Sequence, residues 1–148
     1  MNKNTGFTLI EVLIAMLVLA VGLLGLAGLQ ATSLGNSQSA YNRNQATQLA
    51  YDLADRMRSN KLEVATYTTI LPGAATAKAN CLTTTGCLPS NMAENDLFEW
   101  NKAVRDTLPN GVGTIAVAAG VFTITITWDD DRDGDDSNNP NFQTSFRL

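Results

Sequence analysis

The stretch Gly6-Phe7-Thr8-Leu9-Ile10-Glu11 begins an apolar segment that continues through residues 12–29 without another charged side chain. At 1.5 Å of rise per residue, a helix over residues 7–29 would span about 34 Å, enough to cross a hydrocarbon core of about 30 Å. Glu11 is the exception, because a charged group inside a membrane costs on the order of 2.5–3.5 kcal/mol on insertion scales. We therefore interpret Glu11 as functional, with a carboxylate that snorkels to the membrane edge as the alternative.

These six residues resemble the class III signal sequence of type IV pilins and pseudopilins, which joins a glycine, an aromatic residue, an apolar run and a buried acid in this order. The resemblance implies that a prepilin peptidase cleaves between Gly6 and Phe7 and that the new amine of Phe7 is methylated. It also implies that Glu11 pairs with the N-terminal amine of a neighbouring subunit. An ordinary secretory signal would instead carry a small-residue cleavage site after the apolar run, where residues 27–31 match poorly. A plain membrane anchor is a further alternative.

The composition disfavours several other classes of protein. The chain has 148 residues and a net charge of −4, with no basic cluster that would suit a nucleic acid. It has no histidine, which excludes Ser-His-Asp and Cys-His catalysis and the usual zinc sites. The remaining catalytic candidates are clustered aspartates, too close together to divide the roles of acid and base. We therefore expect a structural protein with no enzymatic activity and no small-molecule substrate.

Beyond the apolar run, the pattern predicts that the same helix continues as an amphipathic segment to residue 59. Its apolar stripe comprises Leu34, Tyr41, Leu49, Leu53 and Met57, widened by alanines 46, 50 and 54. The opposite face carries polar residues that include Asn42. We expect three parts: a leader over residues 1–6, a transmembrane or filament-core half-helix over residues 7–29, and a globular domain over residues 30–148.

Two cysteines lie in a connection over residues 61–92 that is rich in threonine and alanine and contains proline and glycine. An even pair of cysteines in an exported chain indicates a disulfide, so we expect Cys81 and Cys87 to be bonded, with free thiols as the alternative.

The C-terminal half contains one short helix and three strands. Asp96, followed by Glu99 three residues later, resembles a capping box and predicts a helix over residues 96–108 with Trp100 in the core. Alternating patterns predict strands over residues 114–118, 121–128 and 142–148, with Phe142, Phe146 and Leu148 facing inward in the last. The predicted fold is α+β, with a long N-terminal helix packed on a C-terminal antiparallel sheet. This is the pilin arrangement.

The short helix, its Leu-Pro-Asn-Gly exit and the Ile-Thr-Trp-Asp strand resemble the PilV class of type IV pilus modification proteins. The resemblance implies a minor pilin that supports pilus assembly, adhesion or twitching motility. Its partners would be the prepilin peptidase, other minor pilins, the major pilin and the inner-membrane assembly platform. It implies a single-pass inner-membrane location with a periplasmic domain, and a pilus or cell-surface location after assembly. A minor pseudopilin of a type II secretion system has the same architecture and is the alternative.

An acidic loop follows the second predicted strand. Asp129, Asp131, Asp133 and Gly134 match the D-x-D-x-D-G start of a calcium loop, whose oxygen ligands alternate along the chain. Position 12 holds Pro140 in place of the bidentate glutamate, and Asp135 or Asp136 would have to substitute. Calcium is thus the one cofactor that the sequence suggests. A solvated hairpin loop is the alternative for this segment, and a membrane-associated calcium-binding module is a further alternative for the chain.

Overall fold

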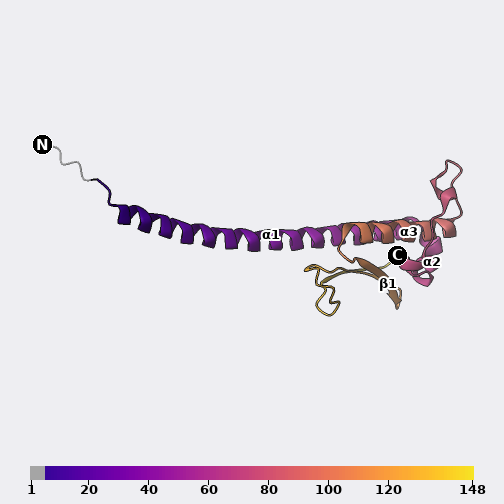
Figure 1. The fold of residues 1–148 in the computed structure, drawn as a ribbon. Coiled ribbons are helices and arrows are strands. Elements are labelled where there is room, and N and C mark those ends of the chain that lie inside the picture. Colours follow the sequence, from indigo (N-terminus) through magenta and orange to yellow (C-terminus); the bar gives the residue numbers. More distant parts are fainter. Residues whose placement is uncertain (1–5) are drawn as a thin grey trace. The chain divides into compact units, whose positions relative to one another are not determined.

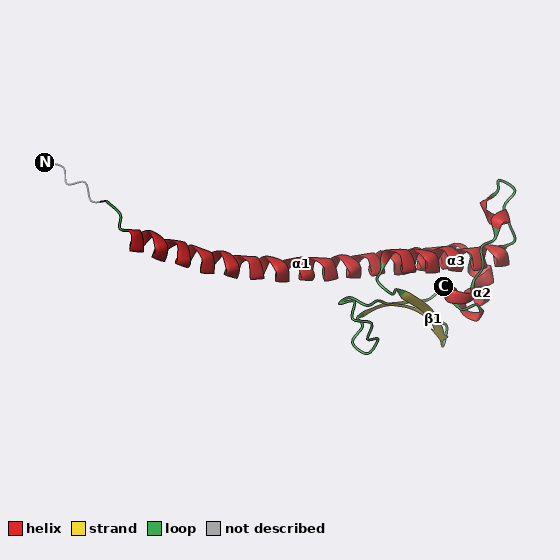
Figure 2. Ribbon diagram, in the orientation of Figure 1, coloured by secondary structure: helices red, strands yellow, loops and turns green. Residues whose placement is uncertain are grey.

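The computed structural model describes residues 6–148 and divides the chain into two compact units, Met1–Ala40 and Tyr41–Leu148 (Figure 1). The predicted leader lies outside the described residues except for Gly6. The principal elements are the helices α1 (Leu9–Ser59), α2 (Val64–Thr69) and α3 (Pro89–Thr107) and the strands β1 (Val112–Ala118), β2 (Val121–Thr127) and β3 (Asn141–Phe146). The α+β fold predicted from the sequence is confirmed (Figure 2).

The first unit consists of the N-terminal part of α1. Every described residue up to Gln38 is exposed, and this part of the helix is apolar enough to cross a membrane, with a mean hydropathy of 2.8 over its most apolar window. The helix begins at Leu9, two residues later than predicted, because Thr8 occupies the capping position. Its end at Ser59 agrees with the prediction.

In the second unit, the remainder of α1 contributes a narrow buried stripe to the core. The stripe is made of small and apolar side chains with one amide at its start: Asn42, Ala46, Ala50, Leu53, Ala54 and Met57. The predicted positions of Leu34 and Tyr41 in the stripe are wrong, since both are exposed. Leu34 precedes the second unit, and Tyr41 lies about 120° around the helix from Leu53. Asn42, predicted on the polar face, is buried instead.

Helix α3 lies beside this part of α1, but it does not begin where the sequence predicted. It starts at Pro89, two turns before Asp96, and proline suits the first helical position because its missing N–H would have no partner there. The capping role predicted for Asp96 is therefore wrong. Asp96 lies buried in the middle of α3, where hydrogen bonds from other elements satisfy its carboxylate.

The three strands form an antiparallel sheet in the order β1-β2-β3. Ala119 and Gly120 connect β1 to β2 with φ angles of +48° and +74°, the backbone of a tight hairpin. Phe122, Ile124 and Ile126 of β2 alternate into the core, as predicted.

Two aromatic side chains of β3 show how α1 covers the sheet. Tyr51 of α1 meets Phe142 edge to face, with ring centroids 6.4 Å apart, and the Arg58 guanidinium lies 4.9 Å from the Phe146 ring centroid. The prediction for Leu148 is wrong, because β3 ends at Phe146 and Leu148 is exposed.

The connection between α1 and α3 is more structured than its composition indicated. It contains α2 and three short 3₁₀ turns, and it buries Tyr67 completely. The predicted disulfide between Cys81 and Cys87 is confirmed.

Candidate functional site

The segment predicted to be processed is fully accessible. Phe7 is 84% exposed, and a Cβ placed on Gly6 would meet no heavy atom within 4 Å. The described chain therefore does not require glycine at position 6 for packing. An external requirement, such as close approach of a peptidase to the backbone, is consistent with this geometry.

Thr8 caps α1, a role that the sequence reading missed. The backbone amide of Glu11 donates to both Thr8 Oγ1, at 3.4 Å, and Thr8 O, at 3.1 Å. The spacing Thr-x-x-Glu is that of a capping box, which could have revealed this role. Glu11 also lies in the first turn, where the helix dipole favours a negative charge.

Within residues 6–148, the Glu11 carboxylate forms neither an ion pair nor a side-chain hydrogen bond. Gly22, Gly25 and Gly28 likewise face open space, since a Cβ at any of them would meet nothing within 4 Å. Both the acid and the small residues of this half-helix are thus available to a partner outside the described chain.

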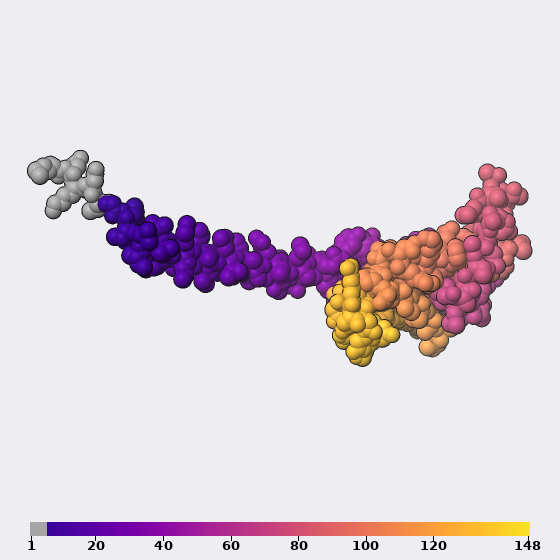
Figure 3. Space-filling model, viewed as in Figure 1, coloured from indigo at the N-terminus to yellow at the C-terminus, as the bar shows by residue number. Residues whose placement is uncertain are grey.

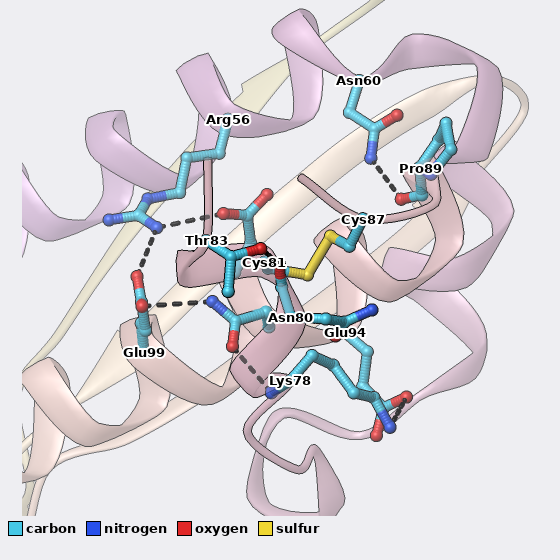
Figure 4. Close-up of a disulfide and its surroundings, with 12 residues drawn as sticks. Arg56, Asn60, Lys78, Asn80, Cys81, Thr83, Cys87, Pro89, Glu94 and Glu99 are labelled. Atoms are coloured by element: carbon cyan, nitrogen blue, oxygen red, sulfur yellow. Dashed lines mark hydrogen bonds and ion pairs between the residues drawn. A yellow bond between two sulfur atoms is a disulfide. The ribbon is translucent and has the colours of Figure 1, made fainter. Parts of the chain in front are cut away.

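The second unit contains an ion network beside the disulfide (Figure 4). Arg56 contacts Asp52 and Asp96 at 3.0 Å and Glu99 at 3.2 Å. Burial by itself would lower the pKa of Arg56, but the bonds to Asp96 and Glu99 outweigh it and raise that pKa above its usual value. Tyr67 Oη donates to Asp96 Oδ2 at 2.5 Å. Burial is the larger cause that raises the pKa of Tyr67, and the contact with Asp96 is the second.

The connection that carries the disulfide is held at both ends. Asn60 Nδ2 donates to Pro89 O at 2.7 Å, next to the end of α1 (Figure 4). Lys78 Nζ pairs with Glu94 at 2.8 Å, and the Lys78 backbone amide donates to Asn95 Oδ1 at 2.9 Å. These contacts hold residues 61–88 beside the start of α3, and the disulfide closes a small ring within the connection.

A cleft of about 570 Å³ opens between the end of α1 and the start of α3. Its three acids, Asp52, Asp55 and Asp96, are each paired with an arginine. Carboxylates held in ion pairs are poor general bases, so this lining does not resemble a hydrolytic site.

The acidic loop brings three of the four predicted metal ligands together. Asp129, Asp131 and Asp133 each offer a carboxylate oxygen, and these oxygens lie within 4.8 Å of one another. Asp135 is outside this group, and its Oδ1 accepts a hydrogen bond from the Ser137 amide at 2.9 Å. The loop lies at the surface of the second unit, in the yellow part of Figure 3.

Two family models match the chain in succession. The prokaryotic N-terminal methylation motif matches residues 1–27, and the model described as type IV pilin Tt1218 matches residues 28–98. The chain thus begins with a match to the prepilin-type methylation motif, and the region that follows it is similar to a type IV pilin. No curated protein and no solved structure matches it.

The matches bear on several of the sequence-based predictions. Pilin domains are structural, and the prepilin signal with its apolar helix indicates membrane anchoring. A prepilin signal also implies processing by a peptidase and incorporation with other pilins. The resemblance to the PilV class stays a prediction, as do the roles of Gly6, Phe7 and Glu11.

Proposed function

We propose that the protein is a minor pilin that takes part in the assembly and initiation of a type IV pilus and is incorporated into it. In this role it supports adhesion or twitching motility. The observation that carries the proposal is an exposed apolar half-helix, bearing a single carboxylate, joined to a compact α+β domain. Such a half-helix has a large apolar surface that packing against other subunits would bury.

The proposed mechanism is assembly without chemical turnover. The peptidase removes residues 1–6, and the methylated amine of Phe7 becomes the new N-terminus. The half-helix then moves from the membrane into the filament, where the helices of neighbouring subunits replace lipid. The Glu11 carboxylate forms an ion pair with the N-terminal amine of a neighbouring subunit, because a buried carboxylate is tolerated only when a cation and hydrogen bonds satisfy it. The exposed glycines allow the helices to approach closely.

The proposed partners follow from this path. They are the prepilin peptidase, the inner-membrane assembly platform, the major pilin and other minor pilins. The globular domain is periplasmic before assembly and exposed on the pilus afterwards. The paired acids in the cleft beside α3 support a protein that is not an enzyme.

Complementation of a gene deletion tests the proposal. The deletion should reduce the sheared pilus fraction, and the wild-type gene should restore it. Gly6→Ala should leave the unprocessed form on an immunoblot, whereas the matched control Gly28→Ala should be processed normally. Normal processing of Gly6→Ala together with full piliation of the deletion strain would defeat the proposal.

A second pair of variants isolates the charge of Glu11. Glu11→Gln should be processed and inserted in the membrane but absent from sheared pili. Glu11→Asp should retain part of the incorporation, because it keeps a carboxylate. The same deletion strain scored for protein secretion distinguishes a type II pseudopilin, whose loss would impair secretion and leave pili intact.

A further inference from the structure

The acidic loop is closed at its base and anchored by contacts with two other segments. Trp128 N donates to Pro140 O at 3.3 Å, which closes the loop, and Asp129 N donates to Pro109 O at 2.9 Å. Asp130 Oδ1 accepts from Trp128 Nε1 at 3.0 Å and from Asn42 Nδ2 of α1 at 2.8 Å. The backbone at the base of the loop, residues 128–130, is therefore held by the rest of the second unit.

Asp129 points inward from this base and is only 2% exposed. Its Oδ2 accepts from Asn110 Nδ2 at 3.0 Å and from the Gly134 amide at 3.2 Å. These two hydrogen bonds reach Oδ2 alone. Its Oδ1 is buried and has no hydrogen-bond partner. A buried anionic oxygen without a partner is unfavourable unless a cation meets it.

A second buried oxygen without a partner lies on the same loop. Asn139 Oδ1 is buried and accepts no hydrogen bond, while its Nδ2 donates to Asp136 Oδ1 at 3.0 Å. Within residues 6–148, Asp129 Oδ1 and Asn139 Oδ1 are the two buried side-chain polar atoms left unpaired. Both are oxygens, the atoms that hard divalent cations bind.

The neighbouring carboxylates add charge to the same place. Asp131 and Asp133 bring oxygens within 4.8 Å of the Asp129 carboxylate, and none of the ion pairs formed by residues 6–148 involves these three groups. Asn138 Nδ2 donates to Asp131 Oδ2 at 3.2 Å and to Asp133 Oδ2 at 3.4 Å, and the Asp135 amide donates to Asp133 Oδ1 at 2.7 Å. Of these two exposed carboxylates, Asp131 therefore keeps one oxygen, Oδ1, without an amide contact. Three like charges at this separation repel one another in the absence of a cation.

From this geometry we infer that the loop over residues 129–139 is a calcium site, with the carboxylates of Asp129, Asp131 and Asp133 as ligands. Calcium fits better than magnesium, because it accepts an irregular set of six to eight oxygens, whereas magnesium demands a small octahedron. The site lacks the bidentate glutamate at position 12, where Pro140 stands. Its affinity therefore belongs to the weak class of calcium modules, with a Kd of about 0.1–1 mM. The inference rests on the second unit alone and is independent of the proposed function.

Thermal unfolding of the full-length protein in detergent micelles tests the inference. After treatment with EDTA, addition of 5 mM CaCl₂ should raise the Tm by roughly 5 °C, since a ligand that binds only the folded state stabilises it. The same concentration of MgCl₂ should give a much smaller rise. An unchanged Tm in CaCl₂, or an equal rise with MgCl₂, overturns the inference.

Two matched double variants assign the ligands. Asp131→Asn/Asp133→Asn should lose the calcium-dependent rise, whereas Asp135→Asn/Asp136→Asn, with the same change in charge on the same loop, should keep it. All four side chains are exposed, so both variants should fold. Equal losses in both variants would indicate a diffuse effect of charge and overturn the ligand assignment.

The Tm measured in EDTA distinguishes a calcium-binding role of Asp131 and Asp133 from a purely structural one. If they served the fold without a cation, their substitution would lower the Tm in EDTA. For a calcium site, the Asp131→Asn/Asp133→Asn variant in EDTA should melt at or above the temperature of the wild type, because repulsion has been removed. Calorimetric titration of CaCl₂ into the wild type and this variant should show binding only in the former.

Discussion

Trp100 of α3 occupies the space that a side chain at position 113 of β1 would need: a Cβ on Gly113 would lie 2.2 Å from Trp100 Cη2. The same indole donates from Nε1 to the Leu49 carbonyl of α1 at 2.8 Å. Trp100 thus joins both helices to the first strand, and it is almost completely buried. The absence of a side chain at Gly113 is what allows the ring to lie there.

Substitution of Gly113 by alanine should therefore destabilise the second unit. Overpacking a well-packed core costs about 1–3 kcal/mol, and here the clash is with a rigid ring. Denaturant unfolding of the full-length protein in micelles, followed by the fluorescence of the two buried tryptophans, measures the loss. Gly73→Ala is the control, because a Cβ there meets nothing within 4 Å. Equal stability of the two variants would contradict the packing described.

Asp96 should be the acid most costly to remove from the second unit. It accepts from Arg56 and Tyr67 and is 8% exposed, so Asp96→Ala leaves a guanidinium and a hydroxyl without their partner. We expect a loss of about 2–3 kcal/mol in the free energy of unfolding, somewhat less than for a fully buried pair because Arg56 remains partly exposed.

Asp55→Ala provides the matched comparison. Asp55 pairs with Arg58 on the same helix surface, and its side chain is 72% exposed. Exposed ion pairs contribute at most about 1 kcal/mol, so this variant should unfold close to the wild type. If both variants lose the same free energy of unfolding, the network around Arg56 does not stabilise the second unit more than an exposed ion pair does.

The errors of the sequence reading follow a physical pattern. Local signals were reliable. The alternating pattern of β2 predicted correctly that Phe122, Ile124 and Ile126 are buried, and the presence of two cysteines predicted the disulfide. Asn42 and Asp96 were misplaced because their burial depends on partners distant in sequence, 88 residues away for Asn42 and 40 and 29 residues away for Asp96. Polarity alone places such residues on the surface, since periodicity carries no information about a distant partner.

The candidate calcium site was likewise predicted only in part. The spacing of Asp129, Asp131 and Asp133 was visible in the sequence, and the structure brings these carboxylates together. The hydrogen bonds from Asn110 and Gly134 that bury and orient Asp129 were not visible, because they depend on the exit of α3 and on the loop backbone. Thr8, by contrast, was missed although its capping-box spacing to Glu11 is local.

Removal of the disulfide should weaken the second unit modestly. The Cys81–Cys87 ring is short, and the chain-entropy model gives about 2 kcal/mol for a ring of this size. Cys81→Ser/Cys87→Ser should lower the free energy of unfolding by that amount. Dithiothreitol should destabilise the wild type to the same level and leave the double variant unchanged. A further loss of stability in the reduced variant would show that the effect of the reductant lies elsewhere.

Acid should weaken the attachment of the connection to α3 through Glu94. The bonds from Lys78 and Thr76 hold the pKa of Glu94 below its usual value, against the opposing effect of desolvation. A depressed pKa in the folded state contributes stability above the unfolded pKa, and this contribution is lost as the pH falls through the folded pKa. The stability difference between wild type and Glu94→Gln should therefore be constant from pH 7 to about pH 5 and shrink below about pH 4.3.

Lys78→Met supplies the partner control for Glu94, because it removes the cation that the carboxylate faces at 2.8 Å and leaves the acid in place. Its pH profile should be flatter than that of the wild type in the same acidic range, since the pKa of Glu94 then returns toward its unfolded value. Denaturant unfolding at intervals between pH 7 and pH 3 measures both profiles. A Glu94→Gln difference that persists unchanged at pH 3 would show that the lost contact is not the ionised pair, and the contribution of Glu94 would then come from its hydrogen bonds with Thr76.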